Sequence, residues 1–280
     1  VVTSDRENTD VNRYKIGLNL SSKVNDYVKF NSRFIVGSKA NGGWALLNAG
    51  KENNTDNVQG ADGQADVSLS NAYFGFTAIP NTVVNIGKQG LTTPYTVAVD
   101  INGNEQTGTG ILALSTFGPV TFGAGYFNNT NLDQSIEINA QQRLGLASQS
   151  TGFGAPTGAT GALDGGSDMY VATVQGDLDF VKLEAWYAGL QNTFGSYTLA
   201  ATSNLDLAEN AKLGLEARYV QLTLNDKVVQ GTDISDKNSM FRFAVDGKFS
   251  IVNARLAYTM TDKKGGLTAL DQDAKNTSLG

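Results

Sequence analysis

Neither cysteine nor histidine occurs in the 280 residues of this chain, and proline occurs only four times. Without cysteine, a disulfide scaffold and a cysteine-bound zinc or iron–sulfur centre are excluded. Without histidine, a Ser–His–Asp hydrolase, a histidine-ligated haem and histidine-bound metal ions are excluded as well. We therefore expect that the protein is not an enzyme and has no cofactor of these kinds.

Long apolar runs and an excess of positive charge are also missing. No stretch of 18 apolar residues exists, which rules out a helical membrane span. A membrane-spanning sheet is not ruled out, because its lipid-facing and water-facing residues alternate and its average hydropathy looks soluble. The 21 basic and 27 acidic residues give a net charge of −6, so the basic footprint of a nucleic-acid-binding protein is absent.

A two-residue periodicity runs through most of the sequence. In the segment 12–20, Tyr14, Ile16 and Leu18 fall on one face of an extended chain. Arg13 and Lys15 fall on the opposite face. This alternation predicts a strand with one apolar and one polar face. Its recurrence predicts strands at about residues 12–21, 27–36, 67–77, 82–90, 109–116, 120–128, 168–176, 180–190, 194–203, 211–224, 238–246 and 249–260.

The connections between these strands alternate between short and long. Connections 78–81 and 117–119 have the length of tight turns, whereas 37–66, 91–108 and 129–167 are long. Short turns at one end and long loops at the other are typical of bacterial outer-membrane barrels, whose strands have about 9–11 residues. All four prolines fall in or beside the connections, as expected where every strand N–H is needed for the ladder.

We therefore predict an all-β protein whose residues 1–280 form one transmembrane antiparallel β-barrel domain. A soluble β-sandwich has the same alternation, but the strand length and the loop asymmetry favour the membrane. Both ends of the sequence fall on the long-loop side. Twelve strands with this parity look like the middle of a larger barrel, so we expect the domain to be incomplete at both ends.

The polar strand faces would line the lumen of such a barrel. Two adjacent strands then contribute four cations, and a fifth near the end of the 82–90 strand is expected to join them. These predicted pore-lining basic residues are Arg13, Lys15, Lys29, Arg33 and Lys88.

The long connection 91–108 carries the opposite charge. It contains Asp100 and Glu105 and no basic residue. If it folds into the barrel as a constriction loop, its carboxylates face Arg13 and Arg33 across a narrow opening. Opposed charges across a water-filled constriction create a transverse field that orients polar solutes and sets ion preference. The hypothesis is a general diffusion channel. The alternative that these charges merely keep the lumen wet stays open.

The outer loops leave two further interpretations open. Loop 37–66 contains Asp56 and Asp62 and leads to Asp66, and carboxylate oxygens of this kind hold Ca²⁺. No EF-hand spacing is present, so calcium is only a weak expectation. The competing interpretation of the whole protein is a surface adhesin or structural outer-membrane protein that acts through its exposed loops and uses the barrel as an anchor.

A family resemblance supports the channel. Residues 72–95, AYFGFTAIPNTVVNIGKQGLTTPY, resemble the strand–turn–strand that leads into the constriction loop of Gram-negative porins, and the Gly-Lys-Gln at 87–89 matches a Gly-basic-Gln motif. The sequence is most similar to the Campylobacter-group major outer membrane protein family, whose second and third strands fit residues 13–20 and 29–34.

This resemblance implies a porin barrel of 16–18 strands with cation preference and a variable outer surface. It also implies a homotrimer in the Gram-negative outer membrane. The expected partners are outer-membrane lipid, lipopolysaccharide, ions and small hydrophilic solutes.

Overall fold

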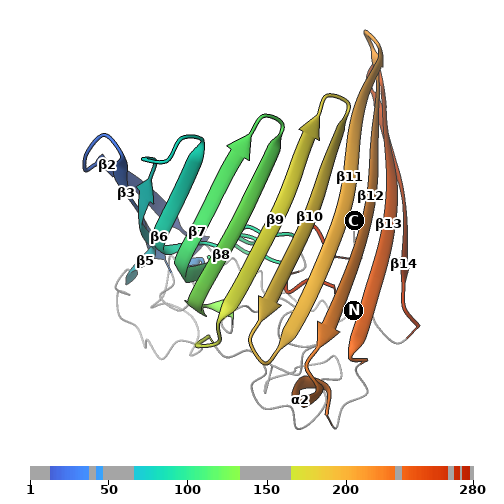
Figure 1. Cartoon of the computed structure of the whole chain (residues 1–280). Coiled ribbons are helices and arrows are strands. Elements are labelled where there is room, and N and C mark those ends of the chain that lie inside the picture. Colours follow the sequence, from blue (N-terminus) through green and yellow to red (C-terminus); the bar gives the residue numbers. More distant parts are fainter. Residues whose placement is uncertain are drawn as a thin grey trace, which may run out of the picture.

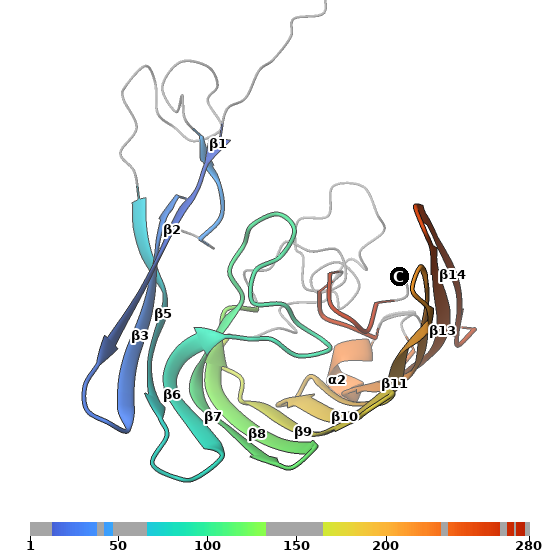
Figure 2. The same cartoon turned by 90° about the horizontal axis from the view of Figure 1, so that it is seen from above.

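The computed structural model describes residues 13–37, 42–46, 66–132, 165–230, 235–263, 268–271 and 273–277. These residues form one antiparallel sheet of twelve strands and a separate two-stranded ribbon. Strand order in the sheet follows chain order, so each strand pairs with its neighbours in the sequence. The sheet curves into a trough, and chain segments fold into its concave side (Figure 1, Figure 2).

The elements agree closely with the alternation in the sequence, and the prediction of an all-β fold is confirmed. The sheet consists of β2 (Ile16–Lys23), β3 (Val28–Gly37), β5 (Asp66–Phe76), β6 (Thr82–Gly90), β7 (Thr107–Phe117), β8 (Val120–Thr130), β9 (Met169–Leu178), β10 (Val181–Leu190), β11 (Phe194–Ala208), β12 (Ala211–Leu224), β13 (Lys237–Phe249) and β14 (Val252–Thr261). The ribbon pairs β1 (Arg13–Tyr14) with β4 (Ala45–Leu46), and the short helix α2 (Asp226–Val229) lies between β12 and β13. In the described part of the chain, no helix has the length and apolar character needed to cross a membrane.

The register of the strands assigns their faces. Leu18 lies opposite Phe34, whereas Asn19 lies opposite Arg33. The face that carries Leu18 is convex and apolar, and its side chains are widely exposed: Ile16 is 60% and Leu256 is 76% accessible. An exposed apolar surface of this extent is the outer wall of a membrane barrel, because only lipid covers it favourably.

Tyrosine rings mark the loop end of the convex face. Tyr126 on β8 contacts Tyr170 on β9, with ring centroids 5.4 Å apart. Tyr187 on β10 contacts Tyr197 on β11 at 5.2 Å. All four side chains are exposed. Their position corresponds to the aromatic belt that lies at a membrane–water interface, where a ring and a hydroxyl are both accommodated.

The concave face changes character along its length. Near the loop ends of β8 to β13 it is apolar and packed rather than wet, because two chain segments fold onto it. The buried cluster includes Leu91, Tyr95, Phe127, Met169, Val171, Leu190, Val220, Leu222, Met240 and Leu270. A hydrophobic core of the kind found in soluble domains therefore attaches loop 91–106 and residues 268–271 to the wall.

The two faces of β9 give a direct test of this orientation. Val174 lies mid-strand on the convex face, and Gln175 beside it faces the lumen opposite Glu184. We expect Val174→Arg to destabilise the folded barrel by about 2–4 kcal/mol, the cost of arginine near the bilayer mid-plane. Gln175→Arg, the matched control, is expected to have little effect. Urea titration in lipid vesicles, followed by the heat-modifiable gel shift, measures both; equal losses would contradict the assignment.

Candidate functional site

Loop 91–106 leaves the end of β6, crosses the concave side of the sheet and returns to β7 (Figure 2). Its neck is closed by a hydrogen bond from Leu91 N to Gln106 O of 2.9 Å. Its tip is a tight turn, in which Asp100 accepts hydrogen bonds from Asn104 N at 2.7 Å and from Asn104 Nδ2 at 2.8 Å. The loop is therefore held together by its own hydrogen bonds and reaches into the trough as one piece.

Glu105 attaches the tip of the loop to the wall at the N-terminal end of the sheet, formed by β2, β3 and β5. Its carboxylate accepts a hydrogen bond from Lys15 Nζ at 2.7 Å, from Arg33 Nε and Nη2 at 3.1 Å each, and from Ser70 Oγ at 2.8 Å. Only 5% of the Glu105 side chain and 8% of the Lys15 side chain are accessible. Buried charges persist only when paired and hydrogen-bonded, so this cluster fixes where the tip lies.

Two opposing effects act on the pKa of Glu105. Burial raises it, but the hydrogen bonds from Arg33, Lys15 and Ser70 and the positive charge of Lys15 outweigh burial, and the pKa lies below its ordinary value. Glu105 is therefore ionised at neutral pH and binds its two cations as a carboxylate.

The short segment 42–46 packs against the same tip. A Cβ placed on Gly103 would come within 2.5 Å of Trp44 Nε1, and one on Gly42 within 2.8 Å of Glu105 Cγ. Both glycines have positive φ, 77° and 64°, which larger residues adopt only with strain. The close approach puts the Trp44 indole in a position to report on the docking of the loop.

Tyr95 attaches the base of the loop to the opposite wall of the trough, at β11. Its hydroxyl is 2.7 Å from Thr198 Oγ1 on β11, and its side chain is fully buried. Burial raises the Tyr95 pKa above its ordinary value, although hydrogen bonds from Ser196, Thr198 and Asn276 and the charge of Arg218 act in the opposite direction. The tyrosine is therefore a neutral hydrogen-bonding anchor at any physiological pH.

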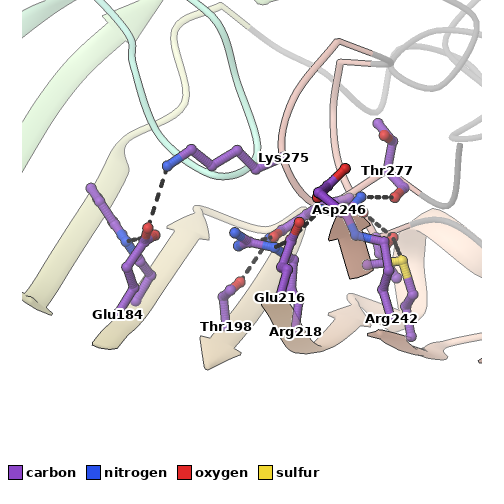
Figure 3. A network of polar contacts seen from close by, with 12 residues as sticks. Glu184, Thr198, Glu216, Arg218, Arg242, Asp246, Lys275 and Thr277 are labelled. Atoms are coloured by element: carbon purple, nitrogen blue, oxygen red, sulfur yellow. Dashed lines mark hydrogen bonds and ion pairs between the residues drawn. The ribbon is translucent and has the colours of Figure 1, made fainter. Parts of the chain in front are cut away.

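The segment 273–277 binds to the same wall (Figure 3). Asn276 Oδ1 accepts from Arg218 Nη1 at 3.2 Å, and Thr277 O accepts from Arg242 Nη1 at 3.2 Å. Glu216 pairs with both arginines, at 3.1 Å to Arg218 and 2.6 Å to Arg242. These buried arginines hold the segment in place, and their position on the inner face follows from the strand alternation. No local pattern in the sequence points to their partners some 35 and 58 residues later.

The loop and the segment also bind each other. Leu270 N and Asp271 N donate to Tyr95 O at 3.0 and 3.1 Å, and Asp273 Oδ2 accepts from Ile101 N at 2.7 Å. Gln106 Nε2 donates to Asp271 Oδ2. They therefore form a single constriction unit, defined here as residues 91–106, 268–271 and 273–277, that crosses the concave side between the two walls.

The pKa of Asp271 is shifted in the opposite direction to that of Glu105. Burial raises it, hydrogen bonds from Asp273 N and Gln106 lower it, and the negative charges of Asp273 and Asp100 raise it further. The net result is a pKa above the ordinary value, because no cation compensates for the burial.

Three of the predicted charged residues meet, but in a different way from the prediction. Glu105, Lys15 and Arg33 are in direct contact, whereas the sequence indicated carboxylates and cations separated by an opening. Asp100 is 5% accessible and is bonded within its own turn. Arg13 is exposed in the ribbon, opposite Leu46. Lys29 is exposed on the inner face toward the turn end of β3.

Lys88 does not join these cations, and here the prediction is wrong. It lies opposite Ala72 on β5, and Ile86 on the same face of β6 lies opposite Phe74. That face is the convex one. Its neighbour Gly87 faces the lumen, since a Cβ there would meet Tyr73. Lys88 therefore points to the outside of the barrel.

The residues of the weak calcium expectation are placed only in part. Asp56 and Asp62 lie outside the described residues, and Asp66 is the exposed first residue of β5. Across the described ranges, no group of three or more acidic residues is arranged to hold a metal ion. The expectation stays untested.

The lipid-facing convex wall and the inward-folded constriction unit define the chain as part of a porin-type barrel of the Gram-negative outer membrane. The family model described as Campylobacter major outer membrane protein matches residues 2–277. The chain belongs to this family, and its members are not enzymes. Among curated proteins, none matches the chain.

Solved structures from Pseudomonas aeruginosa share the fold. OccK8 (OprE) matches with a TM-score of 0.66 and 14% identity, over 98% of this chain and 68% of that one. OccD3 (OpdP) matches with a TM-score of 0.64 and 14% identity, over 98% and 59%. OpdK, solved with vanillate, matches with a TM-score of 0.63 and 12% identity, over 90% and 62%. The chain thus spans about 60% of the length of OccD3 and OpdK.

The Glu105 cluster predicts an acid-dependent release of the loop tip. A carboxyl whose pKa is lowered by folding stabilises the docked state fully above its ordinary pKa of 4.5, and this stabilisation is lost as pH falls through the lowered value. In a Trp186→Phe background, Trp44 is the only tryptophan. Its emission is expected to shift to longer wavelength as the pH falls below 4.5 and through the lowered pKa of Glu105.

Two variants sharpen this prediction. Glu105→Gln is expected to give the acid spectrum already at pH 7, because breaking a buried pair costs about 3–5 kcal/mol. Asp271→Asn serves as the control: its pKa is raised, so its replacement should leave the acid-induced change in place. A Glu105→Gln spectrum identical to that of the parent at both pH values would show that this pair does not dock the loop.

Proposed function

We propose that the barrel to which this chain contributes is a water-filled channel for the passive diffusion of ions and small hydrophilic solutes across the outer membrane. The observation that carries the proposal is the attachment of the constriction unit to both walls, through Glu105 on one side and through Tyr95 and Asn276 on the other. A loop fixed in this way narrows a lumen permanently. It is a sieve rather than a lid that opens for a particular ligand.

The charges support the further proposal of cation preference. On the walls, Arg33, Arg242 and Arg255 each form an ion pair with a carboxylate. The carboxylates of Asp100, Asp271 and Asp273 on the constriction unit instead accept hydrogen bonds from neutral groups, and within the described residues none forms a salt bridge. Negative charge without a paired cation at a narrow point attracts cations and repels anions.

The predicted wall residues Arg13, Lys15, Lys29 and Arg33 retain a place in this proposal. Lys15 and Arg33 bind Glu105, and Arg13 and Lys29 are exposed. A transverse field then arises between Arg13 and Lys29 on the wall and Asp100 on the constriction unit. From the resemblance alone, we further propose that the full-length barrels form trimers in lipid that contains lipopolysaccharide. The adhesin interpretation depends on loops 37–66 and 129–167, which lie mostly outside the described residues.

Conductance in planar bilayers tests the channel and its selectivity. We expect the full-length protein to form open, cation-preferring pores under a salt gradient. The double change Asp100→Asn and Asp273→Asn should lower the cation-to-anion permeability ratio about two- to fivefold, since a unit charge at ~4 Å in water contributes about 1 kcal/mol. Asp177→Asn is the control, because Asp177 lies at the turn end and pairs with Lys182 at 3.2 Å. An unchanged permeability ratio would contradict the role of the constriction unit in selectivity.

A second recording tests the fixed constriction. Replacing Glu105 with Gln frees the loop tip from Lys15 and Arg33, so we expect a wider and noisier open state. Single-channel conductance should rise and its fluctuations increase, whereas Asp177→Asn should retain the parent trace. A Glu105→Gln channel with parent conductance and noise would show that the tip does not limit the pore.

A further inference from the structure

The charged residues of the twelve-stranded sheet are distributed very unequally between its two faces. By register, those in the described strands face the lumen, apart from Lys88 on β6 and Lys237 at the start of β13. The inward set is Lys23, Lys29, Arg33, Asp66, Asp177, Lys182, Glu184, Asp206, Lys212, Glu216, Arg218, Arg242, Asp246, Lys248 and Arg255. A lysine on the lipid face is unfavourable in hydrocarbon and tolerated near the interface, so the position of Lys88 requires an explanation.

Two rows of side chains on the convex face locate Lys88 at a boundary. Lys88 is paired with Thr109 on β7, and Thr109 with Asn129 on β8, which gives a polar row. The next row toward the turn end consists of Ile86, Ile111 and Tyr126, also paired in register. A polar row directly beside an apolar row marks the level at which hydrocarbon gives way to headgroups.

A groove of about 530 Å³ lies at this level. It is lined by Lys88, Thr109, Asn129, Thr130, Asn131 and Gly166, among others. Lys88 forms no salt bridge with any described carboxylate, whereas most inward cations do. Through Lys88, Thr109 and Asn129 the groove therefore offers an ammonium group, a hydroxyl and an amide, with no anion bound among the described residues.

The shape and position of the groove suit one class of ligand. Its volume lies in the range that holds a sugar-sized group rather than a bare ion. The long loops of such barrels face the cell exterior, so the groove is level with the outer leaflet. Resting on the outer-membrane barrel proposed above, we propose that it binds a phosphorylated sugar of the lipopolysaccharide headgroup, with the phosphate on Lys88 and the acyl chains along Ile86, Ile111 and Tyr126. A charged pair of this kind is stronger than a neutral hydrogen bond.

Binding of purified lipopolysaccharide to the full-length protein in detergent tests this site. We expect Lys88→Ala to weaken binding about tenfold, as expected for loss of one charge-assisted contact. Thr109→Val, which keeps the side-chain volume and lies in the same outward row as Lys88, should weaken it about threefold. Lys237→Ala is the matched control, because Lys237 is also an outward lysine at the loop end, and its affinity should equal that of the parent. The heat-modifiable gel shift checks that each variant is folded.

Two further arms separate the sources of the phosphate. Lipopolysaccharide stripped of its phosphates should bind the parent as weakly as intact lipopolysaccharide binds Lys88→Ala. Inorganic phosphate at millimolar concentration should not displace the lipid. The proposal is overturned if Lys88→Ala and Lys237→Ala lose affinity equally, if the stripped lipid binds as tightly as the intact one, or if inorganic phosphate competes fully.

Discussion

Hydrocarbon offers no partner to a backbone N–H or C=O, and every feature of the wall follows from this. Each strand of the twelve-stranded sheet pairs with the sheet strands that precede and follow it in the sequence, so that ladder hydrogen bonds form between segments joined by a tight turn or by one long connection. Prolines, which lack an N–H, are confined to connections or their edges. The period of two that pairing imposes then separates an apolar convex face from a concave face that carries the charges.

Inside the trough a different constraint applies, because the constriction unit must stay attached to the wall although water competes for its polar groups. Apolar packing under Leu91 and Leu270 supplies part of the attachment, and buried charges supply its geometry. Glu105 and Asp271 illustrate the two outcomes of burying a carboxyl group. Glu105 meets two cations and has a lowered pKa, whereas Asp271 meets neutral donors and other acids and has a raised one. Acid therefore loosens the first contact and favours the second.

The local pattern predicted the wall well and the charges on it less well. In β6, Val84, Ile86 and Lys88 share one parity, and the alternation alone places all three outside. The position of Lys88 follows this register and not its charge, so the prediction that it lines the lumen is wrong. The sequence predicted that Glu105 and Arg33 face each other, because their charges are opposite. It did not predict that they are in direct contact. The distance between them depends on how far loop 91–106 reaches, and no strand pattern encodes that.

The sequence by itself determined the strands, their faces and the alternation of short and long connections, because these depend on residues within a few positions of one another. Only the tertiary structure decided that Tyr95 meets Thr198, that Arg218 holds Asn276, and that the concave face near the loop ends is dry. Such contacts join residues 58 and 103 positions apart. They depend on the curvature of the whole sheet, which brings distant segments over the same patch of wall and leaves no trace in any local pattern.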